Sequence, residues 1–197
     1  MKIGIAQLKS LTPYSQSKYH ETPRLPRELD SDYEKRTWRE HLHYDENENI
    51  FIPGIAFSNA LKEAAQYLSI SVPGKGKSTY TKHFESGVLV HGDLILDIKK
   101  SDAQPEWLHL NSDGRRGGGR RVMRCYPRIM KWAGEVVYLI NDDILTKGIF
   151  EKVLMQCGTL IGIGRWRPRN RGMYGSFLLE FLEWIDNHDE AMKYLGR

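Results

Sequence analysis

Apolar and polar residues alternate at the start of the chain, which predicts a strand over residues 1–8 with Ile3 and Ile5 on one face. A short apolar run at residues 50–52 meets a Pro-Gly turn, as a strand does where it ends. Apolar residues then recur at helical spacing and predict a helix over residues 55–68: Phe57, Ala60, Leu61, Ala64 and Leu68.

The second half of the chain holds further apolar segments of strand and helix length. Residues 122–131 and 135–140 are expected to form a hairpin that turns at residues 132–134. The other expected elements are a strand-like segment, an amphipathic helix, a β-rich strand and a short C-terminal helix, at residues 87–98, 146–157, 174–185 and 187–197.

This order of elements predicts an α+β protein with a ferredoxin-like βαββαβ core. The RRM, whose sheet binds single-stranded RNA, has the same fold. Two polar segments interrupt the pattern, at about residues 10–49, with one short helix near residues 33–41, and at about residues 100–121. We interpret both as insertions in a single domain spanning residues 1–197.

Composition and charge narrow the class of partner. Of the 197 residues, 40% are hydrophobic, which suffices for a packed core and argues against disorder throughout. The net charge is +4 and the pI about 9.0, but acidic residues concentrate in residues 28–48 and after residue 180. The basic residues also cluster, and a local positive surface of this kind favours an anionic partner. One cluster comprises Arg115, Arg116, Arg120, Arg121, Arg124, Arg128 and Lys131.

Two cysteines, Cys125 and Cys157, do not make a disulfide framework or a CxxC pair, which indicates a reducing, intracellular compartment. The first residues lack the apolar core of a signal peptide. No window approaches the roughly 18 apolar residues of a membrane span. We therefore expect a soluble cytoplasmic protein with no membrane partner.

The most distinctive segment is residues 162–175, which we name the Gly/Arg loop. Its glycines would let backbone amides approach a phosphate, and its arginines would follow a phosphate backbone. The rings of Trp166 and Tyr174 would stack on bases. The alternative is a solvated basic turn. The candidate residues are Gly164, Arg165, Trp166, Arg167, Arg169, Arg171, Gly172 and Tyr174.

The helix start after the Pro-Gly turn is a second candidate, because a helix N-terminus presents free amides to a phosphate. Its residues are Ser58, Asn59 and Lys62. An ordinary strand-to-helix turn is the alternative, and on this segment alone it is favoured.

The Gly-rich arginine cluster before residue 122 is a third candidate, since such arms make non-specific nucleic-acid contacts, here beside Tyr126 and Trp132. A solvated flexible loop is an equally good interpretation. The candidate residues are Arg115, Arg116, Arg120 and Arg121.

Candidates for catalysis or metal binding are weaker. His41, His43 and Asp45 lack a further partner at metal-ligand spacing, so we predict no metal site and no cofactor. Asp30 and Asp32 are the only acid–base candidates, and lone aspartates in an acidic segment are usually solvated.

Two of these segments together resemble the RAMP superfamily, the RNA-binding proteins of CRISPR effector complexes. Its backbone subunits carry an I-P-G-S-S-L-K turn opening the first helix, and this chain keeps the Ile-Pro-Gly and loses the paired serines at Ile52-Pro53-Gly54-Ile55-Ala56-Phe57-Ser58. A C-terminal G-x-G-R-x-x-x-x-G-x-G loop is similar, with slightly longer spacing, to Gly162-Ile163-Gly164-Arg165 and Gly172-Met173-Tyr174-Gly175.

The resemblance implies a ferredoxin-like palm that grips a single strand of RNA, or less favourably DNA, by its phosphates. It also implies a thumb, for which residues 101–121 or residues 121–140 are candidates, and association with itself or with other CRISPR-type subunits. Some superfamily members resemble metal-dependent endoribonucleases with an aspartate after the first strand, so Asp30 or Asp32 would mark that alternative. A virus-encoded mimic or inhibitor of a CRISPR complex is the other alternative.

Overall fold

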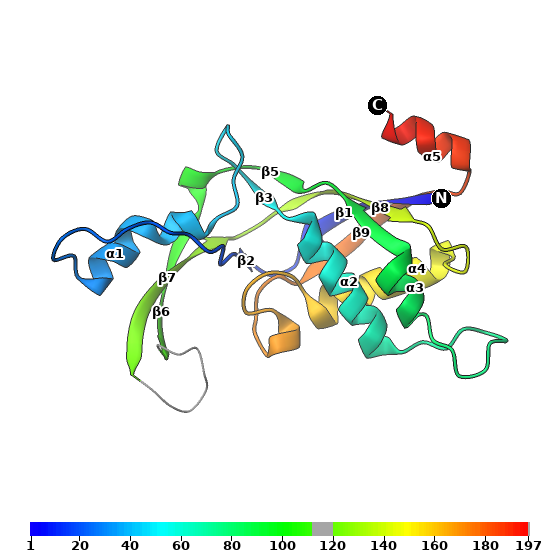
Figure 1. The fold of residues 1–197 in the computed structure, drawn as a ribbon, viewed down its shortest axis with the longest axis horizontal. Helices are drawn as coiled ribbons and strands as arrows, with labels where there is room; N and C mark the ends of the chain where they lie inside the picture. Colours follow the sequence, from blue (N-terminus) through cyan, green and yellow to red (C-terminus); the bar gives the residue numbers. More distant parts are fainter. Residues whose placement is uncertain (112–119, 197) are drawn as a thin grey trace.

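The computed structural model describes residues 1–111 and 120–196, and its body is built on a four-stranded antiparallel sheet with two helices on one face (Figure 1). The strand order is β4-β8-β1-β9. In chain order this is second, third, first and fourth, which confirms the predicted ferredoxin-like α+β fold. The elements are β1 (Lys2–Ser10), α2 (Gly54–Leu68), β4 (Val88–His91), β8 (Ala133–Ile140), α4 (Lys147–Gln156) and β9 (Phe177–Ile185).

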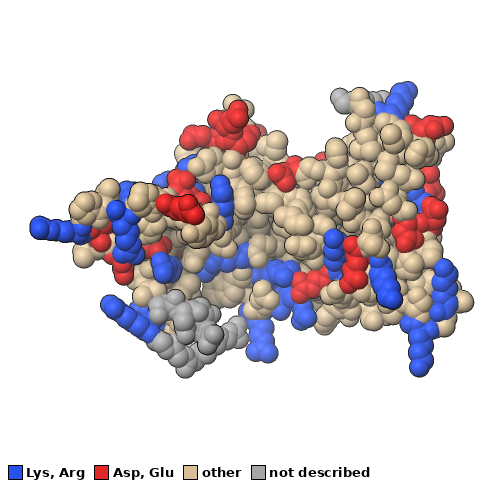
Figure 2. Space-filling model, viewed as in Figure 1, with Lys and Arg blue, Asp and Glu red and all other residues tan. Residues whose placement is uncertain are grey.

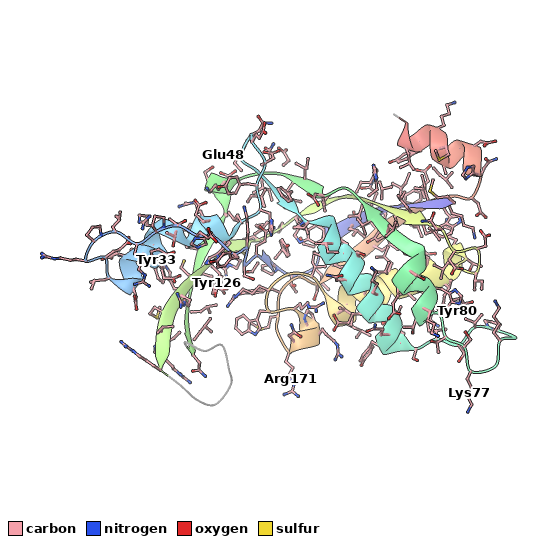
Figure 3. The ribbon with its side chains drawn as sticks, in the orientation of Figure 1. Tyr33, Glu48, Lys77, Tyr80, Tyr126 and Arg171 are labelled. Carbon is pink, nitrogen blue, oxygen red and sulfur yellow. The ribbon has the colours of Figure 1, made fainter. Side chains whose placement is uncertain are left out.

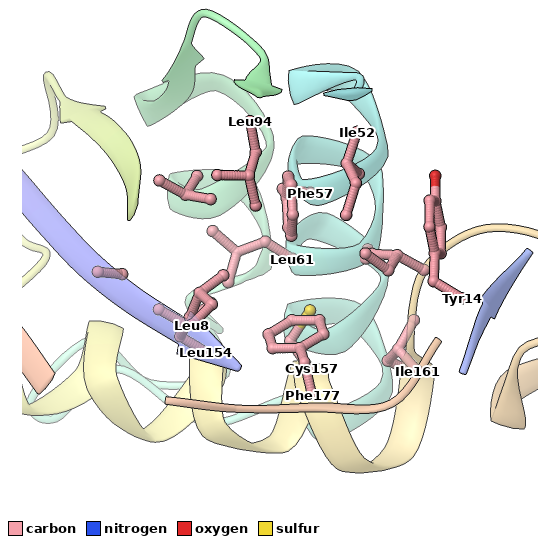
Figure 4. Close-up of a cluster of buried hydrophobic side chains, with 14 of the residues drawn as sticks. Leu8, Tyr14, Ile52, Phe57, Leu61, Leu94, Leu154, Cys157, Ile161 and Phe177 are labelled. Carbon is pink, nitrogen blue, oxygen red and sulfur yellow. The ribbon is translucent and has the colours of Figure 1, made fainter. Parts of the chain in front are cut away.

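The main core lies between this sheet and the helices α2 and α4. Ala6 and Leu8 of β1 face the helices, and Phe57 and Leu61 of α2 pack towards them (Figure 4). Trp132, directly before β8, belongs to the same core, and its ring centroid lies 6.1 Å from that of Phe57. Burial of these large side chains, each worth about 1.5–3 kcal/mol, holds the helices on the sheet.

The opposite face of the sheet carries a small second core. Ile3 and Ile5 point to this side, as their spacing predicts. They pack with Ile185 at the end of β9 and with Ala191 of α5 (His188–Leu195). The side chain of Asn187 caps α5 by accepting from the backbone N–H groups of its first turn. The C-terminal helix therefore covers part of the face that α2 and α4 leave open.

A projecting arm extends from the body on one side (Figure 1). It consists of a three-stranded sheet and of helical turns packed on it, and we use the name arm for these elements throughout. The elements are β2 (Tyr14–Ser15), α1 (Asp30–Thr37), the 3₁₀ turn Trp38–His41, β6 (Gln104–Asn111) and β7 (Arg121–Ile129). The arm thus combines parts of both segments that interrupt the predicted pattern with the strand β7.

The expected hairpin of residues 122–131 and 135–140 is wrong. Its first half lies in β7, which pairs with β6 and β2, whereas its second half is β8, which pairs with β1 and β4. Trp132 is the reason, because its buried ring anchors the connection in the core and its N–H and C=O bond to Ser10. The two strands therefore continue into different sheets.

Other boundaries differ in smaller ways. The strand β6 occupies residues 104–111 of the polar segment at about residues 100–121, while Arg115 and Arg116 lie outside the described residues. The segment at residues 87–98 divides at Gly92 into β4 and β5 (Leu94–Lys99), and β5 pairs with β3 (Asn49–Ile52). A short helix, α3 (Thr81–Gly87), was not predicted. In the part of the chain that the structure describes, no helix is both long and apolar enough to cross a membrane.

Candidate nucleic-acid interface

A groove of about 1010 Å³ lies where the arm meets the Gly/Arg loop. Residues from five segments line it: the stretch after β2, α1 with its following 3₁₀ turn, β6, β7 and the Gly/Arg loop. Figure 2 shows Lys and Arg side chains on the lower side of this region and Asp and Glu side chains at the upper edge of the molecule. The cationic side chains among the described lining residues are Lys18, Arg121, Arg124 and Arg165.

Rings follow one another along the groove from the arm towards the Gly/Arg loop. The ring of Tyr33 on α1 stacks on His20 at 6.3 Å between centroids, and His20 meets His41 edge to face at 4.7 Å. His41 in turn stacks on Tyr126 of β7 at 5.0 Å. Figure 3 shows Tyr33 and Tyr126 together on the arm. These rings form a continuous series of side chains of the kind that also stacks with bases.

Arg165 extends this series into the Gly/Arg loop. Its guanidinium carbon lies 3.7 Å from the ring centroid of Tyr126 and 6.0 Å from that of Trp166. Burial lowers the pKa of the Arg165 guanidinium, and the neighbouring Tyr126 and Glu106 oppose this shift. Among the described residues its buried Nη1 atom has no hydrogen-bond partner. We call the whole series the ring ladder: Tyr33, His20, His41, Tyr126, Arg165 and Trp166.

Trp166 holds an uncommon backbone conformation at the end of the ring ladder. Its φ of 56° lies in the left-handed region, which bulky side chains rarely adopt. The carbonyl of Trp166 accepts from the N–H of Tyr174 at 3.0 Å, and a Cβ at Gly172 would come within 1.7 Å of that same oxygen. Trp166 keeps 36% of its surface exposed. Strained conformations of this kind concentrate at binding sites.

Tyr174 supports the loop instead of offering a free ring. It is 7% exposed, and its hydroxyl donates to the carboxylate of Glu106 on β6. Glu106 also lies 3.8 Å from Arg128. Tyr174 therefore joins the Gly/Arg loop to the arm, and base stacking by this residue is not compatible with its burial.

The arginines of the Gly/Arg loop occupy three different environments. Arg167 and Arg169 turn away from the groove and pair with Glu63 of α2, at 2.8 Å and 2.9 Å. Arg171 is exposed with a φ of 59° and points away from the body (Figure 3). Only Arg165 lines the groove, so four arginines that alternate in sequence have three different environments.

The start of α2 lies on the Glu63 side of the loop. Asn59 and Lys62 line a shallow depression of about 410 Å³ together with Glu63 and Arg169. Ser58 is 8% exposed and faces the interior. The N–H of Gly54 at the helix start donates to Asp93, so this amide is not free for a phosphate.

The glycines of the loop serve internal packing. A Cβ at Gly164 would lie 2.3 Å from the Tyr14 ring, and one at Gly175 would lie 1.8 Å from the Ile163 carbonyl oxygen. The loop amides are also used internally: the Arg165 N–H donates to Ser15 and the Ile163 N–H donates to Gly175, each at 2.9 Å. The expected cradle of backbone amides is therefore largely occupied, and the side chains carry the surface chemistry.

Glu34 is a site residue that the sequence did not reveal, because it lies in an acidic stretch. It is 3% exposed and accepts from Arg124 Nη1 at 2.6 Å and from the Cys125 N–H at 2.9 Å. The carboxylate thereby fixes α1 on β7 and orients Arg124 at the groove. His20 also escaped notice, since its ring partners are distant in sequence.

The weaker sequence candidates lie apart from the ring ladder. Asp30 and Asp32 occupy the first turn of α1, and both are exposed. Asp30 pairs with Arg24 at 2.5 Å, and this hydrogen bond lowers its pKa. Over residues 1–111 and 120–196, no three His, Cys, Asp or Glu side chains gather as they would around a metal ion. Of the basic cluster, Arg121 lines the groove and Arg120 is exposed.

The strand order, the two covering helices and the projecting arm define the class of the protein as a ferredoxin-like fold with an inserted arm. Among solved structures it is similar to a chain of the Type III-B Cmr-beta structure bound to cognate target RNA, with a TM-score of 0.57 and 13% identity. The match covers 93% of this chain and 60% of that one, so this chain spans less than two thirds of its length.

Two further structures show weaker likeness. Cmr6 from Pyrococcus furiosus has a TM-score of 0.47 and 13% identity, covering 91% of this chain and 99% of Cmr6. A chain of a CRISPR RNA-guided surveillance complex has a TM-score of 0.38 and 8% identity, and the match covers 95% of this chain and 71% of that chain. No protein-family model and no curated protein matches the sequence. The chain shares its fold with a chain of the Cmr-beta structure, which agrees with the likeness to CRISPR-associated RAMP proteins that its two turns predict.

Proposed function

We propose that this protein binds single-stranded RNA in the groove between the arm and the Gly/Arg loop, without cutting it. The observation that carries the proposal is the ring ladder, in which Tyr126 lies between an imidazole and the Arg165 guanidinium. Rings and guanidinium planes stack with unpaired bases, each stack being worth about 1–3 kcal/mol, and a paired duplex hides those faces.

The cationic side chains of the groove would bind the phosphates of the strand. Arg121, Arg124 and Lys18 lie beside the rings and suit the phosphates of a strand whose bases stack on the ladder. The fold shared with a chain of an RNA-bound Cmr-beta structure favours RNA over DNA as the ligand. It also favours association of this protein with CRISPR-type subunits or with further copies of itself. These partners are part of the proposal.

The direct test is the affinity of the purified protein for a labelled single-stranded RNA, measured by fluorescence anisotropy beside a duplex of the same sequence. We expect the single strand to bind more tightly and Tyr126→Ala to weaken it roughly fivefold to a hundredfold, because the variant removes the ring that holds Arg165 and His41 in the ladder. Tyr67→Ala removes an exposed ring from α2, outside the groove, and is the matched control. Equal losses from both variants, or equal affinity for the duplex, would overturn the proposal.

A further inference from the structure

Two imidazoles occupy the middle of the ring ladder. His20 and His41 come from separate segments, the stretch after β2 and the 3₁₀ turn after α1, and their ring centroids are 4.7 Å apart. Both line the groove. Other rings flank them on each side, Tyr33 next to His20 and Tyr126 next to His41. The pair therefore lies where a strand stacked on the ladder would pass.

The hydrogen bonds of the two rings fix where a proton can be added. His41 Nδ1 lies 2.8 Å from the carbonyl oxygen of Lys18, and a carbonyl only accepts, so Nδ1 carries the proton of the neutral ring. Its Nε2 is then the atom that gains a second proton. His20 Nδ1 lies 3.1 Å from the Thr22 hydroxyl, which donates or accepts. Both rings can become cations without breaking these contacts.

The surroundings oppose two charges in the free protein. Burial lowers the pKa of His20, and His41 and Lys18 lower it further, whereas Glu40 and Glu34 raise it. Glu34 is already bonded to Arg124, and Glu40 to Lys100. The charged and titratable groups around the pair are Lys18, Tyr33, Glu34, Glu40, His109, Arg121, Arg124, Tyr126 and Arg165. Cations outnumber free carboxylates there, so the pair lacks a compensating anion of its own.

We propose that His20 and His41 form a phosphate subsite of the groove that takes up a proton when a nucleic-acid strand binds. The inference rests on the proposed function, because the strand supplies the missing anion. A phosphodiester beside the pair favours the doubly protonated ring that the free groove disfavours. By linkage, uptake of a proton makes the affinity rise as the pH falls.

The test compares the affinity for one single-stranded RNA at about pH 8 and about pH 6, on either side of the ordinary histidine pKa. Uptake of one proton raises affinity by up to about tenfold per pH unit, so we expect a gain of roughly threefold to thirtyfold over this range. The imidazole pKa values of His20 and His41, followed by NMR, should rise when the RNA is added. A pH-independent affinity in a protein that binds RNA overturns this inference and leaves the proposed function standing, whereas absence of binding at both pH values sinks the proposed function itself.

A double variant, His20→Phe with His41→Phe, keeps both rings and removes both titrations. It should flatten the pH dependence. His91→Phe, at an exposed histidine of β4 outside the groove, is the matched control and should keep the slope of the unmodified protein. A double variant that retains the full pH dependence would contradict the assignment. The NMR measurement on the unmodified protein decides the matter even where the double variant fails to fold, since unchanged imidazole pKa values overturn it.

Discussion

Single residues of the Gly/Arg loop do not act alike, although their sequence pattern is uniform. Arg165 faces Tyr126 in the groove, whereas Arg167 and Arg169 are held by Glu63 on the other side of the loop. The alternation of arginines identifies a basic loop. It cannot tell which side each guanidinium takes, because that depends on left-handed turns at Trp166 and Arg171 and on a carboxylate about 100 residues earlier.

Arg165→Ala should weaken binding of single-stranded RNA about tenfold to a hundredfold, because a charge-assisted contact is worth roughly 1.5–3 kcal/mol. Arg169→Ala removes the same charge from a half-exposed ion pair with Glu63, and such pairs contribute at most about 1 kcal/mol. We expect that variant to lose less than about fivefold in affinity, which is the equivalent of about 1 kcal/mol. Anisotropy titrations of both variants check this, and an equal or reversed ranking would show that the strand runs over α2 instead.

At the scale of elements, the Gly/Arg loop is a packed unit clamped against β2. Gly164 has a φ of 74°, and its missing side chain makes room for the Tyr14 ring and the Ser15 carbonyl. Gly76, in the loop before α3, also has a positive φ of 59° but nothing within 4 Å of a Cβ. Alanine substitutions at the two glycines therefore distinguish the energetic cost of the left-handed backbone from that of a steric clash with β2.

Gly164→Ala should therefore lower the free energy of unfolding by about 2–4 kcal/mol, since it adds a steric clash to left-handed strain. Gly76→Ala carries the strain alone and should cost about 1–2 kcal/mol. Urea denaturation of the two variants measures the difference. Equal losses would mean that the loop adjusts without its contact to β2.

The pattern of apolar positions predicts the ferredoxin-like elements because β1, α2, α4 and β9 each bury one regular face. The same pattern fails for β7 and β8, since it cannot show that the buried Trp132 directs the two strands into different sheets. The ring ladder as a whole was also beyond prediction, although Tyr126 and the loop residues were noted, because His41 and Tyr126 meet only through the packing of segments distant in sequence.

At the scale of the whole molecule, the groove exists only because the arm stands beside the body. The body supplies the Gly/Arg loop, whereas the arm and the stretch after β2 supply most of the rings and three of the four cationic side chains. Acidic side chains around Glu48 lie at the opposite edge of the molecule (Figures 2 and 3). A strand would therefore be drawn to the groove side, and the affinity should depend on salt in proportion to the phosphates held there.

The salt dependence of single-stranded RNA binding tests this account most directly. Neutralisation of one phosphate by each of the four groove cations, Arg165 included, predicts a slope of roughly −3 for log affinity against log salt, at about −0.7 for each phosphate. The double variant Arg121→Ala with Arg165→Ala should bring the slope to about half that value. Lys75→Ala with Lys77→Ala changes the net charge equally in the exposed loop before α3 and should leave the slope unchanged. Equal effects of the two double variants would contradict a strand bound in the groove.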